Sequence, residues 1–174
     1  MALLNAILII FSCKNSHLSF EQQAAQRFEM AEVLFSQKQY QKSNEICDVL
    51  LSKGLRQPGL LHLKGLNCIH LGDFGAASEY LHQSSVHDPI NEKVWLDLGF
   101  TYTHVHDFEK ALEAFQNGLQ INPKSSSAYN GLGVIHARLG NRQEAIKIFR
   151  LAIKHNPRDK VARGNLVELI KTVS

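Results

Sequence analysis

Apolar residues recur at helical spacing through most of this 174-residue chain. Trp95, Leu98 and Tyr102 are three and four positions apart, which places them on one face of a helix. Ala111, Phe115 and Leu119 are four positions apart, which also places them on one face of a helix. No stretch alternates between apolar and polar residues as a half-buried strand would. The pattern therefore predicts an all-α protein made of successive amphipathic helices.

The same residue types return every 34 positions along the chain. They form three series in one register: Gly65, Gly99 and Gly133; Ala77, Ala111 and Ala145; Pro89, Pro123 and Pro157. Three series with one period indicate an array of repeats. A glycine inside a helix costs about 1 kcal/mol relative to alanine. Its return in each repeat predicts that a neighbouring helix passes close to it, with the alanines on the opposing surface. Each proline ends a repeat, because proline cannot continue a helix.

Two consecutive repeats carry the fullest set of these positions. They read Trp95, Leu98-Gly99, Tyr102, Ala111, Phe115 and Pro123, then Tyr129, Leu132-Gly133, His136, Ala145, Phe149, Ala152 and Pro157. This spacing resembles the tetratricopeptide repeat, over roughly residues 24–174. Asp107 and Asn141 lie at the turn between the two helices of a repeat, where short polar side chains can cap the second helix. The resemblance implies a right-handed superhelical solenoid of helix-turn-helix repeats.

We expect one repeat domain over residues 21–174. Its four repeats are predicted at about 24–57, 58–91, 92–125 and 126–159, followed by a capping helix at 160–173. The first two repeats depart from the pattern at several positions, namely Ser43, Cys47, Lys64, Cys68 and Leu81. Such drift is common in terminal repeats. In the capping helix we expect an apolar stripe and a polar, solvent-facing back. The stripe is Val161, Leu166, Ile170 and Val173, and the back is Arg163, Asn165, Glu168 and Lys171.

Residues 1–20 lie outside the repeats. Ala2–Phe11 is apolar except for Asn5, which is too short for a membrane-spanning helix of about 20 residues but suits the core of a signal peptide. The run Ile10-Phe11-Ser12-Cys13 resembles a lipoprotein cleavage box, although no Lys or Arg precedes the apolar run. Two alternatives stay open: an exported protein, anchored to the cell envelope in the lipoprotein version, or a cytoplasmic protein whose first residues pack on the first repeat or stay unstructured.

In the tetratricopeptide family the first helix of each pair lines the concave groove. The resemblance therefore implies partner-binding residues on the first helices. They are Phe28, Glu32 and Phe35 in the first repeat; His62, Leu66, Ile69 and His70 in the second; Leu96, Phe100, Thr103 and His104 in the third; and Asn130, Val134 and Arg138 in the fourth. Many of these are apolar or aromatic, and such residues mark a partner site when they are exposed. The alternative is that Leu66, Leu96 and Val134 pack against neighbouring first helices.

Some members of the family bind the C-terminal carboxylate of chaperone tails through Lys, Asn and Arg residues in the groove. The matching positions here hold Phe28, Glu32, Leu63, Lys93 and Asp97. Only Lys93 suits a carboxylate, so the sequence argues against that ligand.

The sequence contains no enzyme motif, no glycine-rich phosphate loop and no spacing typical of a metal site. Of its nine histidines, His104 and His106 would point in different directions on a helix, and His62 and His70 are too far apart for one ion. We therefore expect no catalytic residue, cofactor or metal. Cys47 and Cys68 fall on core positions of adjacent helices, where buried thiols behave as small apolar groups. A disulfide between them stays open if the protein is exported.

Charge is unevenly distributed along the chain. Residues 124–174 contain ten Lys or Arg and three Asp or Glu, whereas residues 1–123 contain nine and thirteen. Four of the basic residues, Arg142, Lys147, Arg150 and Lys154, lie on the second helix of the last repeat. This fits either an anionic partner or membrane surface, or a solvated helix back. Nucleic-acid binding is not expected, because no aromatic residues interleave with these charges.

The function that the sequence predicts is a non-catalytic scaffold or adaptor, which holds a peptide or a partner helix in its groove. The alternative is a lipid-anchored bacterial envelope protein that assists the assembly of a surface structure.

Overall fold

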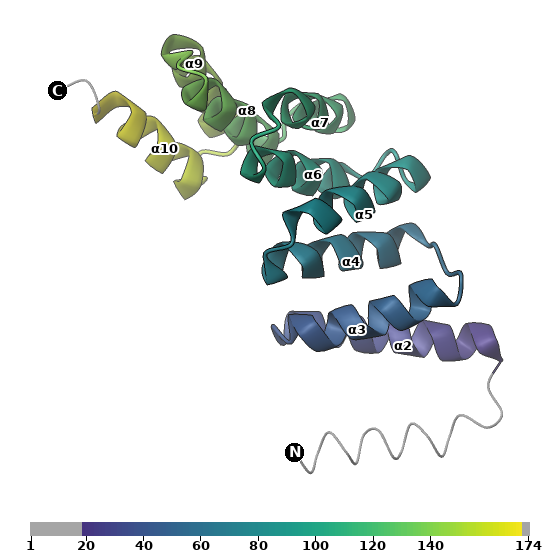
Figure 1. The fold of residues 1–174 in the computed structure, drawn as a ribbon. Helices are drawn as coiled ribbons and strands as arrows, with labels where there is room; N and C mark the ends of the chain where they lie inside the picture. Colours follow the sequence, from purple (N-terminus) through teal and green to yellow (C-terminus); the bar gives the residue numbers. More distant parts are fainter. Residues whose placement is uncertain (1–18, 172–174) are drawn as a thin grey trace. The chain divides into compact units, whose positions relative to one another are not determined.

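A computed structural model describes residues 19–171, and every element within that range is an α-helix. The helices are α2 Phe20–Ser36, α3 Tyr40–Ser52, α4 Pro58–Leu71, α5 Phe74–His87, α6 Glu92–His104, α7 Phe108–Ile121, α8 Ser126–Arg138, α9 Arg142–His155 and α10 Lys160–Lys171 (Figure 1). The all-α class is thereby confirmed. None of these helices combines the length and the apolar character needed to cross a bilayer. The candidate signal or lipoprotein segment, Ala2–Cys13, lies outside the described residues.

The chain divides into two compact bodies after Arg56. In the N-terminal body, α2 begins with a capping box: the Ser19 hydroxyl accepts a hydrogen bond from the Gln22 backbone N–H, and the Gln22 side chain accepts one from the Ser19 N–H. These bonds satisfy donors that the first turn of a helix leaves unpaired. The buried Ser43 hydroxyl of α3 donates to the Ala31 carbonyl of α2 over 2.8 Å. This bond ties the two helices into a hairpin.

The C-terminal body stacks three helix pairs, α4/α5, α6/α7 and α8/α9, and ends with α10 on α8 and α9 (Figure 1). The second helix of each pair also contacts the first helix of the next pair. In addition, the first helices contact one another, α4 with α6, α6 with α8, and α8 with α10. This stacking of helix pairs in chain order is a helical solenoid.

The recurring glycines make room for large side chains. A Cβ atom added at Gly65 would lie 2.7 Å from Leu81, one at Gly99 would lie 2.8 Å from the Phe115 ring, and one at Gly133 would lie 2.6 Å from the Phe149 ring. The predicted close approach is therefore confirmed. At Gly99 and Gly133 the partner differs from the expected alanine, because a phenylalanine of the second helix fills the space. At Gly65 a leucine fills it, and the carbonyl of the expected Ala77 lies 3.4 Å from the added Cβ.

Phe115 is the most enclosed of these side chains. Its ring is 0% exposed, and a Cβ at Gly131 of α8 would lie 2.3 Å from it. The ring of α7 is thus held between the backbone of α6 at Gly99 and the backbone of α8 at Gly131. Two glycines on neighbouring first helices therefore fit one aromatic ring, and this contact joins two successive pairs.

The turns inside the pairs bear out part of the capping prediction. The Asp107 carboxylate accepts a hydrogen bond from the Lys110 backbone N–H at 3.3 Å, and Asp73 does the same for Ala76 at 3.0 Å. A side-chain hydrogen bond from Lys110 holds the pKa of Asp107 below its ordinary value. Asn141 occupies the same position before α9, but its side chain makes no capping bond.

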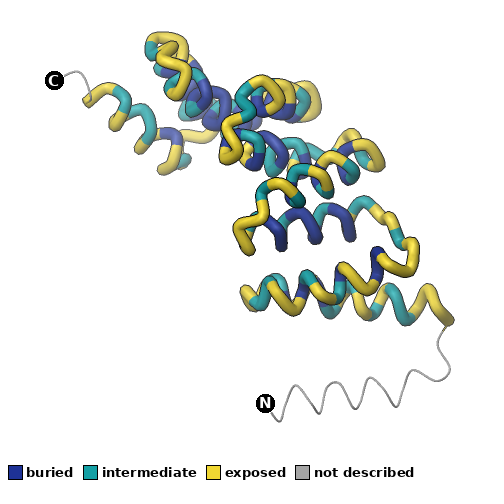
Figure 2. The backbone as a smooth tube through the Cα atoms, viewed as in Figure 1, coloured by how far each residue is buried: buried dark blue, intermediate teal, exposed yellow. Residues whose placement is uncertain are grey.

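Helix α10 differs from the predicted polar cap. Val161 is 63% exposed, Val167 is 49% exposed and Ile170 is 48% exposed. Asn165, which was expected on the polar back, instead donates a hydrogen bond to Asn130 of α8. The predicted stripe is therefore wrong at Val161 and Ile170, and the predicted back is wrong at Asn165. The reason is that α10 packs on both α8 and α9. Ala162 is the residue of α10 that is buried, and Figure 2 shows most of this helix as intermediate or exposed.

Candidate partner-binding surface

The first helices of the C-terminal body, α4, α6, α8 and α10, form a surface that we call the first-helix face. Three hydrogen bonds connect these helices in succession. His62 Nε2 and Asp97 Oδ2 are 2.7 Å apart, Arg138 donates to the Thr103 carbonyl at 3.3 Å, and the Asn165 amide donates to Asn130 Oδ1 at 2.8 Å. Each joins residues 35 positions apart, one more than the repeat length. The bonds therefore fix the stagger between neighbouring first helices.

Two of the predicted groove residues serve this internal bonding rather than the surface. Thr103 and Asn130 are each 7% exposed. The Thr103 hydroxyl donates to the Gly99 carbonyl at 2.7 Å, and Asn130 accepts from Asn165. Both side chains are turned into the helix layer because their polar atoms are satisfied there. They differ in this from the expectation that they line an open groove.

Four predicted apolar residues of the C-terminal body are half-buried. Ile69 packs against the core around Leu81 and Leu98, and Leu96 packs against the core around Phe115. Leu66 and Val134 have the same intermediate exposure. Leu96 is therefore partly used in internal packing, on a cluster that includes residues of α7 and of the neighbouring first helix α8.

Four predicted residues remain exposed on the first-helix face, namely His70, Phe100, His104 and Arg138. Phe100 is 37% exposed, and its ring meets that of Phe115 edge to face, with 5.0 Å between ring centroids. His104 stacks on Phe74 at 4.6 Å, with an interplanar angle of 6°. Neighbouring rings thus contact both side chains while part of each stays exposed.

A hollow of about 430 Å³ lies where α8, α9 and α10 meet. Its lining residues are Val134, Ala137, Arg138, Phe149, Asn165, Glu168 and Leu169. The walls are mainly apolar, and Arg138 adds a cation whose guanidinium also bonds the Thr103 carbonyl. Only Val134 and Arg138 were predicted for the groove. The α10 residues were missed because that helix was interpreted as a cap. Its register nevertheless continues that of the first helices, since Asn165 lies 34 positions after Gly131 of α8 and 68 after Asp97 of α6.

The predicted residues of the N-terminal body have mixed exposure. Phe28 is half-buried and Glu32 is exposed. Phe35 is half-buried, and its ring meets that of Tyr40 edge to face at 5.3 Å. Phe35 therefore helps to close the turn between α2 and α3.

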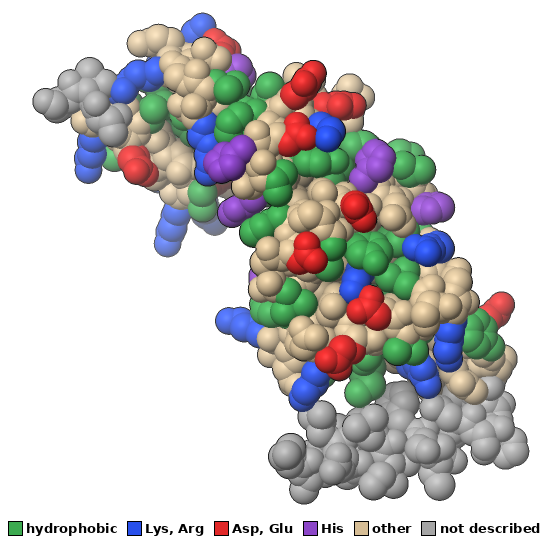
Figure 3. All heavy atoms as spheres, viewed as in Figure 1, with side chains coloured by type: hydrophobic (Ala, Val, Ile, Leu, Met, Phe, Trp, Pro, Cys, Tyr) green, Lys and Arg blue, Asp and Glu red, His purple; other side chains and the backbone are tan. Residues whose placement is uncertain are grey.

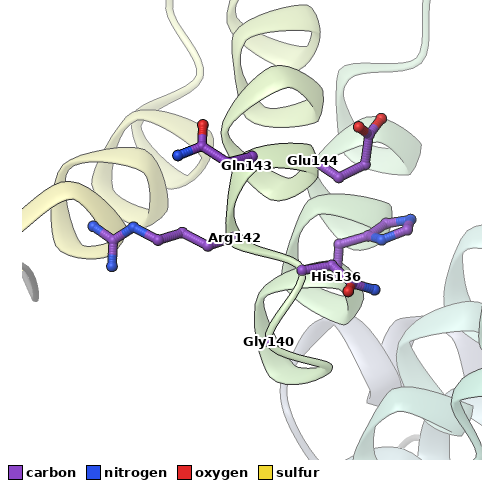
Figure 4. Close-up of a pocket in the computed structure, with 6 residues that line it drawn as sticks. His136, Gly140, Arg142, Gln143 and Glu144 are labelled. Atoms are coloured by element: carbon purple, nitrogen blue, oxygen red, sulfur yellow. The ribbon is translucent and has the colours of Figure 1, made fainter.

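A second hollow, of about 530 Å³, lies at the turn between α8 and α9 and is lined by His136, Gly140, Asn141, Arg142, Gln143 and Glu144. In Figure 4 the Arg142 side chain extends toward α10, where it donates to the Ile170 carbonyl at 3.2 Å. His136 Nδ1 is buried without a hydrogen-bond partner. In the part of the chain that the structure describes, no three His, Cys, Asp or Glu side chains lie together in a way that could hold a metal ion.

Basic side chains gather at the end of the C-terminal body, over α9 and α10 (Figure 3). Lys147 forms a 3.1 Å ion pair with Glu144. Arg150 and Lys154 on α9 are exposed, as are Lys160, Arg163 and Lys171 on α10. This end of the molecule is therefore positively charged, with Glu144, Asp159 and Glu168 as its acidic residues after position 124.

Residues 92–157 match the family model described as tetratricopeptide repeat. No curated protein matches the sequence. Among solved structures, YrrB, described as a TPR protein with an unusual peptide-binding site, is 19% identical with a TM-score of 0.77, covering 83% of this chain and 75% of that one. A tetratricopeptide repeat protein from Parabacteroides merdae is 18% identical with a TM-score of 0.83, covering 97% and 65%. The first TPR of Spaghetti (RPAP3), bound to the HSP90 peptide SRMEEVD, is 19% identical with a TM-score of 0.63, covering 67% and 93%. At these identities the structural likeness shows the fold.

Proposed function

Because this chain is a tetratricopeptide repeat protein, we propose that it is a non-catalytic scaffold that holds a partner peptide or helix on its first-helix face. The observation that carries the proposal is the hollow of about 430 Å³ between α8, α9 and α10. It offers Val134, Ala137 and Leu169 to an apolar side chain and Arg138 to an acceptor. A concave apolar site with a few polar groups is typical of ligand binding.

The accessible aromatic edges support the same face. Phe100 is exposed beside its buried neighbour Phe115, and rings held rigidly by a helix are frequent anchors at interfaces. Two of the structural neighbours are described as binding peptides, YrrB by its peptide-binding site and the RPAP3 repeat domain by its bound HSP90 peptide. Binding of a peptide to one face of the stacked helices is the function that we carry over to this chain.

The proposed partner is not a chaperone tail held by its terminal carboxylate. Leu63, at one of the clamp positions, is 7% exposed. Asp97, at another, is bonded to His62 at 2.7 Å and would repel a carboxylate. Lys93 is the basic residue among the clamp positions of the C-terminal body. We therefore propose recognition through apolar side chains that fill the hollow.

Selection of a phage-displayed random peptide library on the full chain tests this proposal. The selected peptide is then titrated by fluorescence anisotropy against the wild type, Val134→Glu and Gln116→Glu. Val134 lines the hollow, whereas Gln116 is exposed on α7. We expect Val134→Glu to weaken binding about tenfold or more and Gln116→Glu to leave it unchanged. A folded Val134→Glu variant that binds as the wild type does would overturn the proposal.

The envelope alternative is a second proposal, and the run Ile10-Phe11-Ser12-Cys13 is the observation that favours it. Export as a lipoprotein would remove Met1–Ser12 and leave a lipid-modified Cys13 as the first residue. Mass spectrometry of the protein recovered from its own cells tests this directly, since an intact Met1 contradicts it.

A further inference from the structure

One side of helix α10 is exposed to solvent, although the repeat pattern predicts that a following helix covers it. Val167 of α10 stands 34 positions after Gly133 and Ile170 stands 34 after His136. On α6 and α8 the face that contains the glycine receives Phe115 of α7 and Phe149 of α9, respectively. On α10 the equivalent residues are 49% and 48% exposed. Within residues 19–171, α10 packs on α8 and α9, and neither covers this side. We call it the α10 outer face.

Gly164 on this face has no packing explanation among residues 19–171. It lies in the middle of α10, where glycine costs about 1 kcal/mol relative to alanine. Gly65, Gly99 and Gly133 each have a side chain within 3 Å of an added Cβ. A Cβ at Gly164 would meet nothing within 4 Å. Internal packing therefore does not require glycine at this position.

The missing side chain leaves a notch. A hollow of about 370 Å³ is lined by Gly164, Val167, Glu168 and Lys171. These residues stand at positions i, i+3, i+4 and i+7, the arrangement of four side chains that receives one knob from a facing helix in knobs-into-holes packing. The notch thus has the geometry of a helix-binding hole, with Gly164 as its floor.

The charged residues around the notch indicate which kind of partner it can bind. Lys160, Arg163 and Lys171 are exposed on α10, and Glu168 is the acidic residue there. Two copies that met through this face would bring their basic residues together, and juxtaposed like charges oppose association. Acidic side chains on a partner would instead be attracted to this surface.

We propose that the α10 outer face binds an amphipathic helix of a partner protein, with a large apolar side chain in the notch at Gly164 and Asp or Glu residues opposite Lys160, Arg163 and Lys171. The notch takes the knob because Val167 blocks the position at which Gly99 and Gly133 receive a ring. This surface adjoins the proposed peptide site, which opens between α8, α9 and α10 and shares Glu168 with the notch.

Three synthetic helical peptides of about 20 residues, long enough to be helical in water, test the proposal on the full chain by fluorescence anisotropy. The first has a leucine stripe with glutamate flanks, the second replaces glutamate by lysine, and the third replaces the central leucines by alanine. We expect the first to bind at least tenfold more tightly than either of the others, and its affinity to fall as salt is added. Equal affinity for the glutamate and lysine peptides overturns the proposal.

Variants of the chain locate the binding. Gly164→Leu fills the notch without a clash, since the space above it is open. It should weaken binding of the glutamate peptide at least tenfold and leave the melting temperature at or above that of the wild type. Gln116→Leu places the same side chain at an exposed position of α7 and should not change binding. Undiminished binding by Gly164→Leu places the site elsewhere. A concentration-dependent dimer in sedimentation that Gly164→Leu disrupts assigns the face to a second copy, and also overturns the proposal.

Discussion

At the scale of single residues, the surroundings decide what a glycine does. Gly99 and Gly131 both face the ring of Phe115, and an added Cβ would approach that ring within 2.8 Å and 2.3 Å. The ring has no room to move away because it is fully buried between them. Gly164 is also a glycine inside a helix, but a Cβ atom added there would meet no atom within 4 Å. The two sites therefore respond in opposite directions to the same substitution.

Gly99→Ala should destabilise the protein by about 1–3 kcal/mol, as overpacking of a core does. Gly164→Ala should stabilise it by about 0.5–1 kcal/mol, because alanine is the better helix former where space is open. Urea denaturation of both variants and the wild type measures the two effects. A Gly99→Ala variant as stable as the wild type would show that the fit between Gly99 and Phe115 does not limit packing.

Phe115→Ala should cost about 3–5 kcal/mol of unfolding free energy, the range for a fully buried phenylalanine. Its ring contacts two helix pairs, so its loss leaves a cavity that spans both. Phe108→Ala on the same helix is the matched control, because Phe108 is only partly buried. Chemical denaturation compares the two, and similar losses would mean that the ring of Phe115 has no special place in the core.

At the scale of elements, α10 is held at its start by one carboxylate. Asp159 accepts hydrogen bonds from the backbone N–H groups of Val161 and Ala162, both at 3.0 Å, and from the Ser126 hydroxyl at 2.6 Å. Burial alone would raise the pKa of Asp159, but these three hydrogen bonds outweigh it and hold the pKa below its ordinary value. The charged form therefore caps α10 and ties it to α8.

A group whose folded-state pKa is lowered contributes stability that is complete above its ordinary pKa and is lost as pH falls through the folded value. Asp159→Ala should therefore cost about 1 kcal/mol at pH 7, as the loss of an N-cap does. The difference from the wild type should shrink at an acid pH below the lowered folded-state pKa of Asp159, where its carboxyl is protonated. Urea denaturation at both pH values measures this stability difference, with Glu113→Ala at an exposed position of α7 as a control. A pH-independent difference would contradict the capping role.

At the scale of the whole molecule, stacked helix pairs generate surfaces that no single helix has. The hollow at Val134 and Arg138 draws residues from three helices, and the stagger of the first helices depends on bonds such as that between His62 and Asp97. Partner binding on the first-helix face therefore depends on the stacking as well as on the exposed residues. At Phe100, the contribution to partner binding and the contribution to helix packing can be measured separately.

Phe100→Ala should weaken binding of the selected partner peptide by about 2 kcal/mol, as the loss of an aromatic anchor does. Its cost in folding stability should be clearly smaller than that of Phe115→Ala, because the Phe100 side chain is already 37% exposed. Peptide titration and chemical denaturation of the same variant give both values. Intact binding by this variant, or a loss of stability as large as that of Phe115→Ala, would place the binding surface elsewhere.

The fold class could be predicted from the sequence because repetition made weak local signals consistent. Gly65, Gly99 and Gly133 each predict a close helix contact, and together with the alanine and proline series they set the repeat length. The turn residue Asp107 was also predictable as a cap, since an N-cap acts within its own turn. The candidate site was less predictable. Val134 and Arg138, both predicted for the groove, line the hollow, but Thr103 and Asn130, predicted on the same grounds, are buried.

The sequence by itself determined that the chain forms paired helices in a repeating register, because helical periodicity, glycine, proline and capping residues act over a few positions along the chain. Only the tertiary structure decided which polar side chains face a neighbouring helix. Asn165 and Asn130 bond to each other across 35 positions, and that choice turned α10 inward at Asn165 and left Val167 and Gly164 outside. Such pairings depend on the stagger of packed helices, which the sequence sets only through contacts between residues far apart in the chain.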